Sequence, residues 1–110
     1  MSRQDFDRLI LDAVDKSLSS LGDSAKQTIY FHLKTTFNIK KQDIPNKIVE
    51  FHAAMEKTFG LGCKFLEILI MKNLYEKVGQ SFKYKPEQQD LVFTEYINSA
   101  RRSFLKKTIK

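Results

Sequence analysis

The segment 59–74, FGLGCKFLEILIMKNL, is the most apolar part of the chain, and its length limits what the chain can fold into. A helix that crosses a membrane needs about 20 predominantly apolar residues. Lys64 and Glu67 interrupt the run, and charges in the middle of a membrane span are costly. We therefore expect this segment to lie in the core of a water-soluble domain.

Two glycines, Gly60 and Gly62, stand directly before the apolar run. Glycines before a helix also occur in nucleotide-binding loops, but those loops need more glycines and a preceding strand. Here the preceding residues have the spacing of a helix, and no Lys-Ser or Lys-Thr pair follows. We interpret the glycines as a tight connection, with Gly60 in a left-handed conformation and Gly62 allowing two helices to approach closely.

The residues that follow, 61–78, carry apolar side chains on more than one side of a helix. Such a helix is normally surrounded by others, so we predict a central helix packed by the remaining ones, with Leu69 in the core. Glu67 then has apolar neighbours. We expect Glu67 to be partly exposed or to pair with a Lys or Tyr from another helix, because an unpaired buried charge is costly. The alternative is that Glu67 is a tuned acid or a ligand contact.

Four further helices are predicted from apolar residues that recur at spacings of three and four. Their expected ranges are about 3–20, 24–37, 44–59 and a last helix that starts at Pro86. The buried face of that last helix is expected to contain Phe93, Ile97, Ala100 and Phe104. The chain is therefore predicted to be all-α, a compact bundle of about five helices that forms a single domain over residues 1–110.

The only cysteine, Cys63, cannot form an internal disulfide. A reducing, cytoplasmic setting is the natural interpretation. No signal peptide is recognisable, because Asp5, Asp7 and Asp12 interrupt the first residues, where a secreted protein carries a basic and then an apolar segment.

Charge is unevenly spread along the chain, whose formal net charge is +6. Residues 1–23 hold five Asp against three basic residues, a net −2, so the remainder carries +8. The last ten residues alone contribute +5. This asymmetry permits binding to nucleic acid, an acidic protein or an anionic membrane, and does not choose among them.

Three stretches resemble a small archaeal family, the Nitrosopumilus output domain of type five: LSSLGDSAKQTIYFHL (18–33), the Ile44-Pro45 pair, and FGLGCKFLEILIMKNLYEKVG (59–79). The likeness covers roughly residues 9–80. Its sharpest points are helix–helix junctions, so it speaks for a shared fold more than for shared chemistry. The resemblance implies a non-enzymatic output or interaction module in an archaeal cytoplasm.

Catalytic or metal chemistry would have to use His32, His52 or Cys63. His52 with Glu56, and Cys63 with Glu67, are each spaced by four residues, so each pair can share a helix face. Two such faces in contact would make a four-ligand zinc site. The paired CxxC or HxxxH signature is missing, however, so we predict no metal site, no cofactor and no catalytic residue. A thiol enzyme is not expected either, because nothing in the sequence places a His beside Cys63.

Six basic residues and one tyrosine supply the candidate contacts to a partner or to nucleic acid. They are Lys83, Tyr84, Lys85, Arg101, Arg102, Lys106 and Lys107, in addition to a cluster of Lys40, Lys41 and Lys47. Lys and Arg neutralise phosphates, and an aromatic ring stacks on bases. A helix-turn-helix is not favoured, because the connection before the third helix exceeds the usual three or four residues.

We therefore predict a non-enzymatic protein-interaction or output module in signal transduction, with another protein as its partner and no membrane contact. The alternative is a small basic regulator that binds DNA or RNA. A homodimer is left open. Exposed apolar residues, with Phe82 and Tyr84 as examples, are where a partner surface is expected.

Overall fold

The computed structural model describes residues 3–79 and 93–108. Within these ranges the chain forms five α-helices: α1 (Arg3–Ser19), α2 (Asp23–Phe37), α3 (Ile48–Phe59), α4 (Cys63–Lys77) and α5 (Phe93–Thr108). Two short 3-10 helices, η1 (Lys41–Asn46) and η2 (Gly60–Gly62), precede α3 and α4. No strand occurs in these ranges, so the predicted all-α class is confirmed. The predicted start of the last helix at Pro86 lies outside the described residues.

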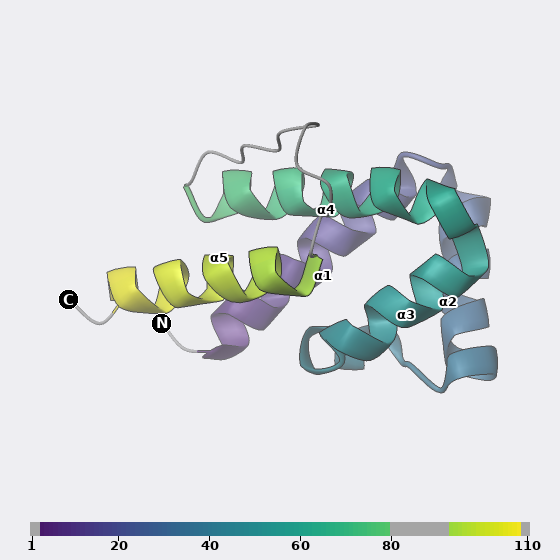
Figure 1. Ribbon diagram of the computed structural model, residues 1–110, viewed down its shortest axis with the longest axis horizontal. Coiled ribbons are helices and arrows are strands. Elements are labelled where there is room, and N and C mark those ends of the chain that lie inside the picture. Colours follow the sequence, from purple (N-terminus) through teal and green to yellow (C-terminus); the bar gives the residue numbers. More distant parts are fainter. Residues whose placement is uncertain (1–2, 80–92, 109–110) are drawn as a thin grey trace.

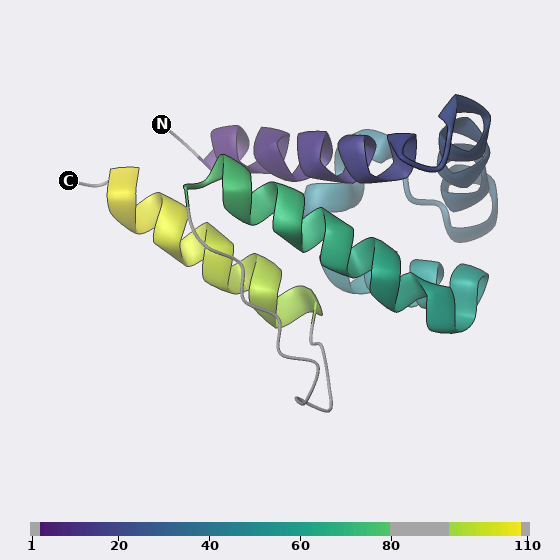
Figure 2. The same ribbon diagram turned by 90° about the horizontal axis from the view of Figure 1, so that it is seen from above.

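Helix α4 lies along α1 and also contacts α3 and α5. Figures 1 and 2 show α1, α4 and α5 running alongside one another, with the start of α1 and the end of α5 at the same end of the molecule. Helix α2 lies at the opposite end, where it contacts α1 and α3. The result is a compact helical globule in which α4 has three other helices as neighbours.

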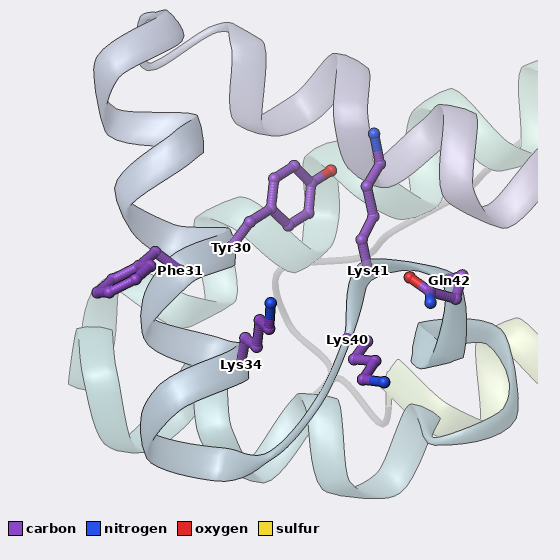
Figure 3. A pocket seen from close by; sticks show the side chains of 6 residues that line it. All are labelled: Tyr30, Phe31, Lys34, Lys40, Lys41 and Gln42. Carbon is purple, nitrogen blue, oxygen red and sulfur yellow. The ribbon is translucent and has the colours of Figure 1, made fainter.

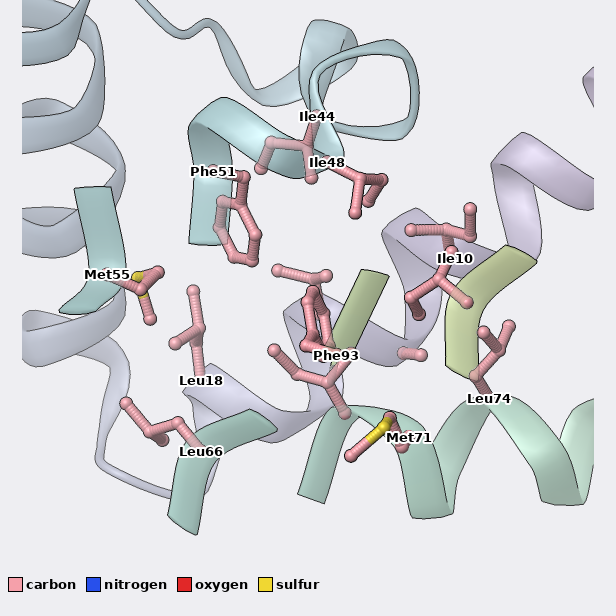
Figure 4. Packing of buried hydrophobic residues seen from close by; sticks show 14 of the residues in the cluster. Ile10, Leu18, Ile44, Ile48, Phe51, Met55, Leu66, Met71, Leu74 and Phe93 are labelled. Carbon is pink, nitrogen blue, oxygen red and sulfur yellow. The ribbon is translucent and has the colours of Figure 1, made fainter. Parts of the chain in front are cut away.

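Buried apolar side chains from all five helices and from η1 form one cluster. Figure 4 shows how they meet: Phe93 of α5 points towards Phe51 of α3, and the two ring centroids are 6.3 Å apart. The predicted buried face of α5 is confirmed, since Phe93, Ile97 and Ala100 are buried and Phe104 packs against the cluster. Burial of this apolar surface is the main force that holds the helices together.

The predicted third helix, 44–59, is divided in the structure. Pro45 lies in η1, and the chain bends at Lys47 (φ −132°) before α3 begins at Ile48. The backbone N–H of Lys47 donates to the carbonyl of Ile44, three residues back, which is the 3-10 pattern. The bend allows Ile44 and Ile48 both to point into the core (Figure 4).

Among the described residues nothing covers the outer side of α4, which corrects the prediction that all the remaining helices pack around it. Leu61 in η2 is 95% exposed, Phe65 is 74% exposed and Leu69 is 37% exposed. The expected burial of Leu69 is therefore wrong. The physical reason is the position of α2, which packs on α1 and α3, so no described element lies over this side of α4.

The joint between α3 and α4 depends on Gly60. Its backbone has φ 56° and ψ −124°, a conformation with positive φ that residues with a Cβ rarely adopt, and its N–H donates to the carbonyl of Glu56. The positive φ of the left-handed conformation predicted for Gly60 is confirmed, but its ψ lies outside the left-handed helical region. Gly62 has an ordinary helical backbone, and a Cβ there would meet only the Cβ of Phe59, at 3.8 Å. The expected close approach of two helices at Gly62 is therefore wrong.

These two glycines make a matched test. Gly60→Val should destabilise the fold by about 1–3 kcal/mol, because a β-branched residue is strained at positive φ. Gly62→Ala should be neutral or slightly stabilising, since its backbone suits any residue and alanine loses less conformational entropy on folding. Urea denaturation monitored by circular dichroism measures both changes. Equal stability of the two variants would contradict the assigned conformation of Gly60.

Candidate functional site

Helices α3 and α4 bring three potential ligand side chains together: His52, Cys63 and Glu67. One imidazole nitrogen of His52, the thiol sulfur of Cys63 and one carboxylate oxygen of Glu67 all lie within 4.8 Å of one another. Nδ1 of His52 pairs with a carboxylate oxygen of Glu67. The other ring nitrogen, Nε2, lies 3.3 Å from Oε2 of Glu56. We call His52, Glu56, Cys63 and Glu67 the His52 cluster.

Local helix geometry explains the arrangement. Residues four apart lie on the same side of a helix, so α3 presents His52 and Glu56 together, and α4 presents Cys63 and Glu67 together. Only η2 separates the two helices in sequence, and they pack against each other. The ring of His52 also stacks on Phe93 of α5, with centroids 6.2 Å apart and planes 22° apart.

Burial controls the protonation of this cluster. Cys63 and Glu67 are only 3% and 2% exposed. Burial raises the pKa of the Glu67 carboxyl, although the hydrogen bond and the charge of His52 act in the opposite direction. Burial, followed by the charge of Glu67, raises the pKa of the Cys63 thiol to about 12. The thiol is therefore protonated at neutral pH and interacts with the carboxylate of Glu67 as a neutral group.

Two expectations about these residues change. Glu67 is paired, as expected, but it is buried and not partly exposed, and its partner is a histidine and not a Lys or Tyr. A His does lie near Cys63, although no sequence motif indicates it. In the sequence, the only indication of this cluster is the four-residue spacing within each of the two pairs. The spacing does not indicate that the two helix faces meet.

The state of Cys63 leads to a prediction about its reactivity. A rise of the thiol pKa from 9.0 to about 12 lowers the thiolate fraction at neutral pH by about 10³-fold, and the thiolate is the reactive form. Modification by a disulfide reagent should be slower than in the unfolded chain by at least that factor. The rates can be compared with and without denaturant, and similar rates would contradict the buried, protonated thiol.

The residues predicted to contact a partner or nucleic acid differ in where the structure places them. Lys83, Tyr84 and Lys85 lie outside the described residues, and Lys106 and Lys107 fall in the last turns of α5, with side chains outside the described part. Arg102 is exposed. Arg101 points inward: its guanidinium donates to the carbonyl of Pro45 at 3.2 Å and lies over the ring of Phe6, 5.4 Å from the centroid. Arg101 thus ties α5 to η1 and α1.

A shallow basic hollow of about 380 Å³ lies between α2 and η1. Tyr30, Phe31, Lys34, Lys40, Lys41 and Gln42 line it (Figure 3). Nζ of Lys41 pairs with Asp15 at 3.2 Å and lies over the ring of Tyr30, 5.1 Å from its centroid. Lys34 and Lys40 are exposed, and no ion pair to either is found among the described residues. Lys40 and Lys41 are recognisable in the sequence as part of a basic cluster, whereas no pattern in the sequence indicates Tyr30, Phe31 or Lys34.

The uncovered side of α4 is the second surface that sequence analysis missed. Phe65 and Leu69 are four residues apart in α4 and share a face, and Leu61 lies four residues before Phe65 in η2; we call these three exposed residues the apolar stripe. Half-buried Ile68 lies beside them, and Lys72 continues the same face. The signal in the sequence was the excess of apolar residues in this segment, which was assigned entirely to the core.

Comparisons with known proteins give no match to this chain, whether with protein-family models, with curated proteins or with solved structures. The resemblance to the archaeal output domains therefore stays a prediction. Among the helices of the described ranges, none combines the length and the hydropathy needed to cross a bilayer.

Proposed function

We propose that this chain is a non-enzymatic protein-interaction module that binds its partner through the apolar stripe. The observation that carries the proposal is the exposure of three large apolar side chains in successive turns of one face. Single exposed apolar residues are ordinary on a protein surface, whereas contiguous ones mark interaction sites. The resemblance to output domains adds the expectation that the partner belongs to a signalling pathway.

The stripe has the form of a helix-recognition surface. Its residues supply anchors at positions i, i+4 and i+8, the pattern with which amphipathic helices and grooves recognise each other. Transfer of each of these side chains out of water contributes about 1.5–3 kcal/mol when burial is complete. A few such anchors at the centre of an interface commonly dominate its binding energy.

Charge around the stripe indicates the chemistry of the partner. Lys72 is exposed and continues the face of the stripe, while Glu76 lies one turn beyond Lys72. Charge complementarity with Lys72 therefore favours an apolar helical segment with acidic flanks. A second copy of this chain is a poorer partner, because it would bring another Lys72 to the interface.

Selection of peptides from a displayed library tests this function. The unmodified chain should select apolar peptides with acidic flanks, and Phe65→Ser should weaken their binding at least tenfold. Val49→Ser is the matched control, because Val49 is an exposed apolar residue of α3 that lies outside the stripe. Peptides that bind both variants as well as the parent would remove the stripe as the binding surface.

The second candidate function, nucleic-acid binding, is favoured by the basic hollow. Lys34 and Lys40 are placed to neutralise phosphates, and the exposed ring of Phe31, which is turned away from Tyr30 in Figure 3, is available for stacking on a base. The paired Asp15 reduces the charge of this site. We therefore expect weak binding.

A titration of labelled duplex and single-stranded nucleic acid at two salt concentrations distinguishes the two functions. For an interaction module, binding should be weak and should disappear near physiological salt. Tight binding that persists at that salt, and that falls when Lys34 and Lys40 are both changed to Gln, would favour the nucleic-acid function. Arg102→Gln tests separately whether α5 contributes to nucleic-acid binding, because Arg102 is exposed on that helix.

A further inference from the structure

We propose that His52, Cys63 and Glu67 bind one zinc ion between α3 and α4. Imidazole nitrogen, thiolate sulfur and carboxylate oxygen are the three donor types that zinc uses in proteins. Here one of each comes from two packed helices, and the three ligand atoms lie within 4.8 Å of one another. This inference is independent of the proposed function.

The spacing of the ligand atoms is close to what zinc requires. Bond lengths of about 2.0–2.3 Å in a tetrahedron place neighbouring ligand atoms about 3.4–3.6 Å apart. The two ligand atoms of His52, Cys63 and Glu67 that lie farthest apart therefore have to approach each other by about 1 Å. The carboxylate of Glu67 has to move away from Nδ1 of His52 to admit the ion. Side-chain rotations of this size leave the two helices in place.

Glu56 supplies the outer partner that zinc-binding histidines usually have. If Nδ1 of His52 binds the metal, the proton of the ring lies on Nε2, which is 3.3 Å from the carboxylate of Glu56. This histidine–carboxylate pairing fixes the tautomer and the orientation of a metal ligand. Stacking on Phe93 restrains the same ring.

The environment favours zinc over harder cations and gives it access. Magnesium and calcium prefer oxygen ligands, whereas two of the three donors here are sulfur and nitrogen. Metal binding releases the thiol proton of Cys63 to solvent, and the resulting thiolate and the carboxylate of Glu67 together balance the charge of one divalent ion, which offsets the cost of burying Glu67. The side chain of His52 is 31% exposed, so the site is reached from solvent on the side of this ring.

Titration of the reduced full chain with cobalt(II), and then with zinc, tests the site. Cobalt should bind at one equivalent per chain and produce a thiolate-to-cobalt charge-transfer band with visible bands of a tetrahedral ion; one equivalent of zinc should remove both. This readout comes from the unmodified chain, so it does not depend on any variant that fails to fold. A folded chain that binds cobalt without a thiolate band would overturn the proposal.

Substitutions then assign the ligands. Cys63→Ser should abolish the charge-transfer band, and His52→Gln or Glu67→Gln should weaken binding at least tenfold. Glu56→Gln should weaken it by about 10–100-fold while the band is kept, as expected for an outer partner. His32→Gln is the matched control, because His32 is the other of the two histidines and lies on α2 beside Thr36. Equal losses in His32→Gln and His52→Gln would contradict the assignment.

Discussion

Ile70→Ala should lower the free energy of unfolding by about 2–5 kcal/mol, whereas Leu69→Ala, one residue earlier, should lower it by only about 1 kcal/mol. Ile70 is 0% exposed and Leu69 is 37% exposed. Truncation of Ile70 removes buried methyl groups and leaves a cavity. Truncation of Leu69 removes a side chain that keeps more than a third of its surface in water, so less buried surface is lost and no closed cavity forms.

The pair of substitutions tests which side of α4 faces the core. Both residues are aliphatic and adjacent in the same helix, so helix propensity changes little between the two variants. Urea denaturation followed at the helical circular dichroism band gives both free energies by linear extrapolation. Equal losses of unfolding free energy would show that Leu69 is buried as well, and this would contradict an exposed apolar side of α4.

His52→Ala, measured on metal-free protein, should lower the free energy of unfolding by about 3–5 kcal/mol at pH 7, as is typical when a buried ion pair loses one partner, and by less at pH 5. The substitution leaves the carboxyl of Glu67 buried without its partner, and the folded chain then has to protonate it. Protonation of a carboxyl becomes more costly as the pH rises above its ordinary pKa of 4.5, so the loss grows with pH.

The sign of this pH dependence follows from the difference in the pKa of Glu67 between the folded and the unfolded chain. The pKa of Glu67 is raised in the folded state, so its contribution to stability is fully present below about pH 4.5 and is lost as pH rises through the folded-state pKa. Removal of His52 raises that pKa further and extends the loss to higher pH. Cys63 stays protonated in this range, and Glu56 remains as the nearby acidic group.

The double variant His52→Ala with Glu67→Gln is the control. Gln cannot ionise, so the pH-dependent part of the loss should disappear although the cavity left by the imidazole remains. Denaturation midpoints at pH 5 and pH 7 for the three proteins separate the two effects. A loss that is the same at both pH values in His52→Ala would contradict the pairing of His52 with Glu67.

The helix class and the buried face of α5 could be predicted because both depend on local spacing. Phe93, Ile97 and Ala100 recur at three or four residues, and polar residues separate them. In α4, by contrast, apolar residues lie on every side, so the pattern does not indicate which side other helices cover. Leu69 was assigned to the core for this reason, and only the position of α2 shows otherwise.

The His52 cluster was predictable as two pairs but not as a group. The four-residue spacings place His52 with Glu56 and Cys63 with Glu67 on their own helices. Whether those faces meet depends on the direction in which the chain leaves α3, and that is set by the backbone of Gly60. Spacing also does not predict that Arg101 points inward while Arg102 is exposed, because the contact of Arg101 with Pro45 joins residues 56 apart in sequence.

The central claim is that the apolar stripe is the binding surface of this chain, and amide chemical-shift mapping tests it most directly. A peptide selected by the unmodified chain is added to isotope-labelled protein, and the shifted amides are assigned. We predict shifts concentrated at residues 61–72 and their loss in Phe65→Ser, with the parent spectrum otherwise retained. Shifts centred on residues 30–42 or on α5, with residues 61–72 unchanged, would contradict the claim.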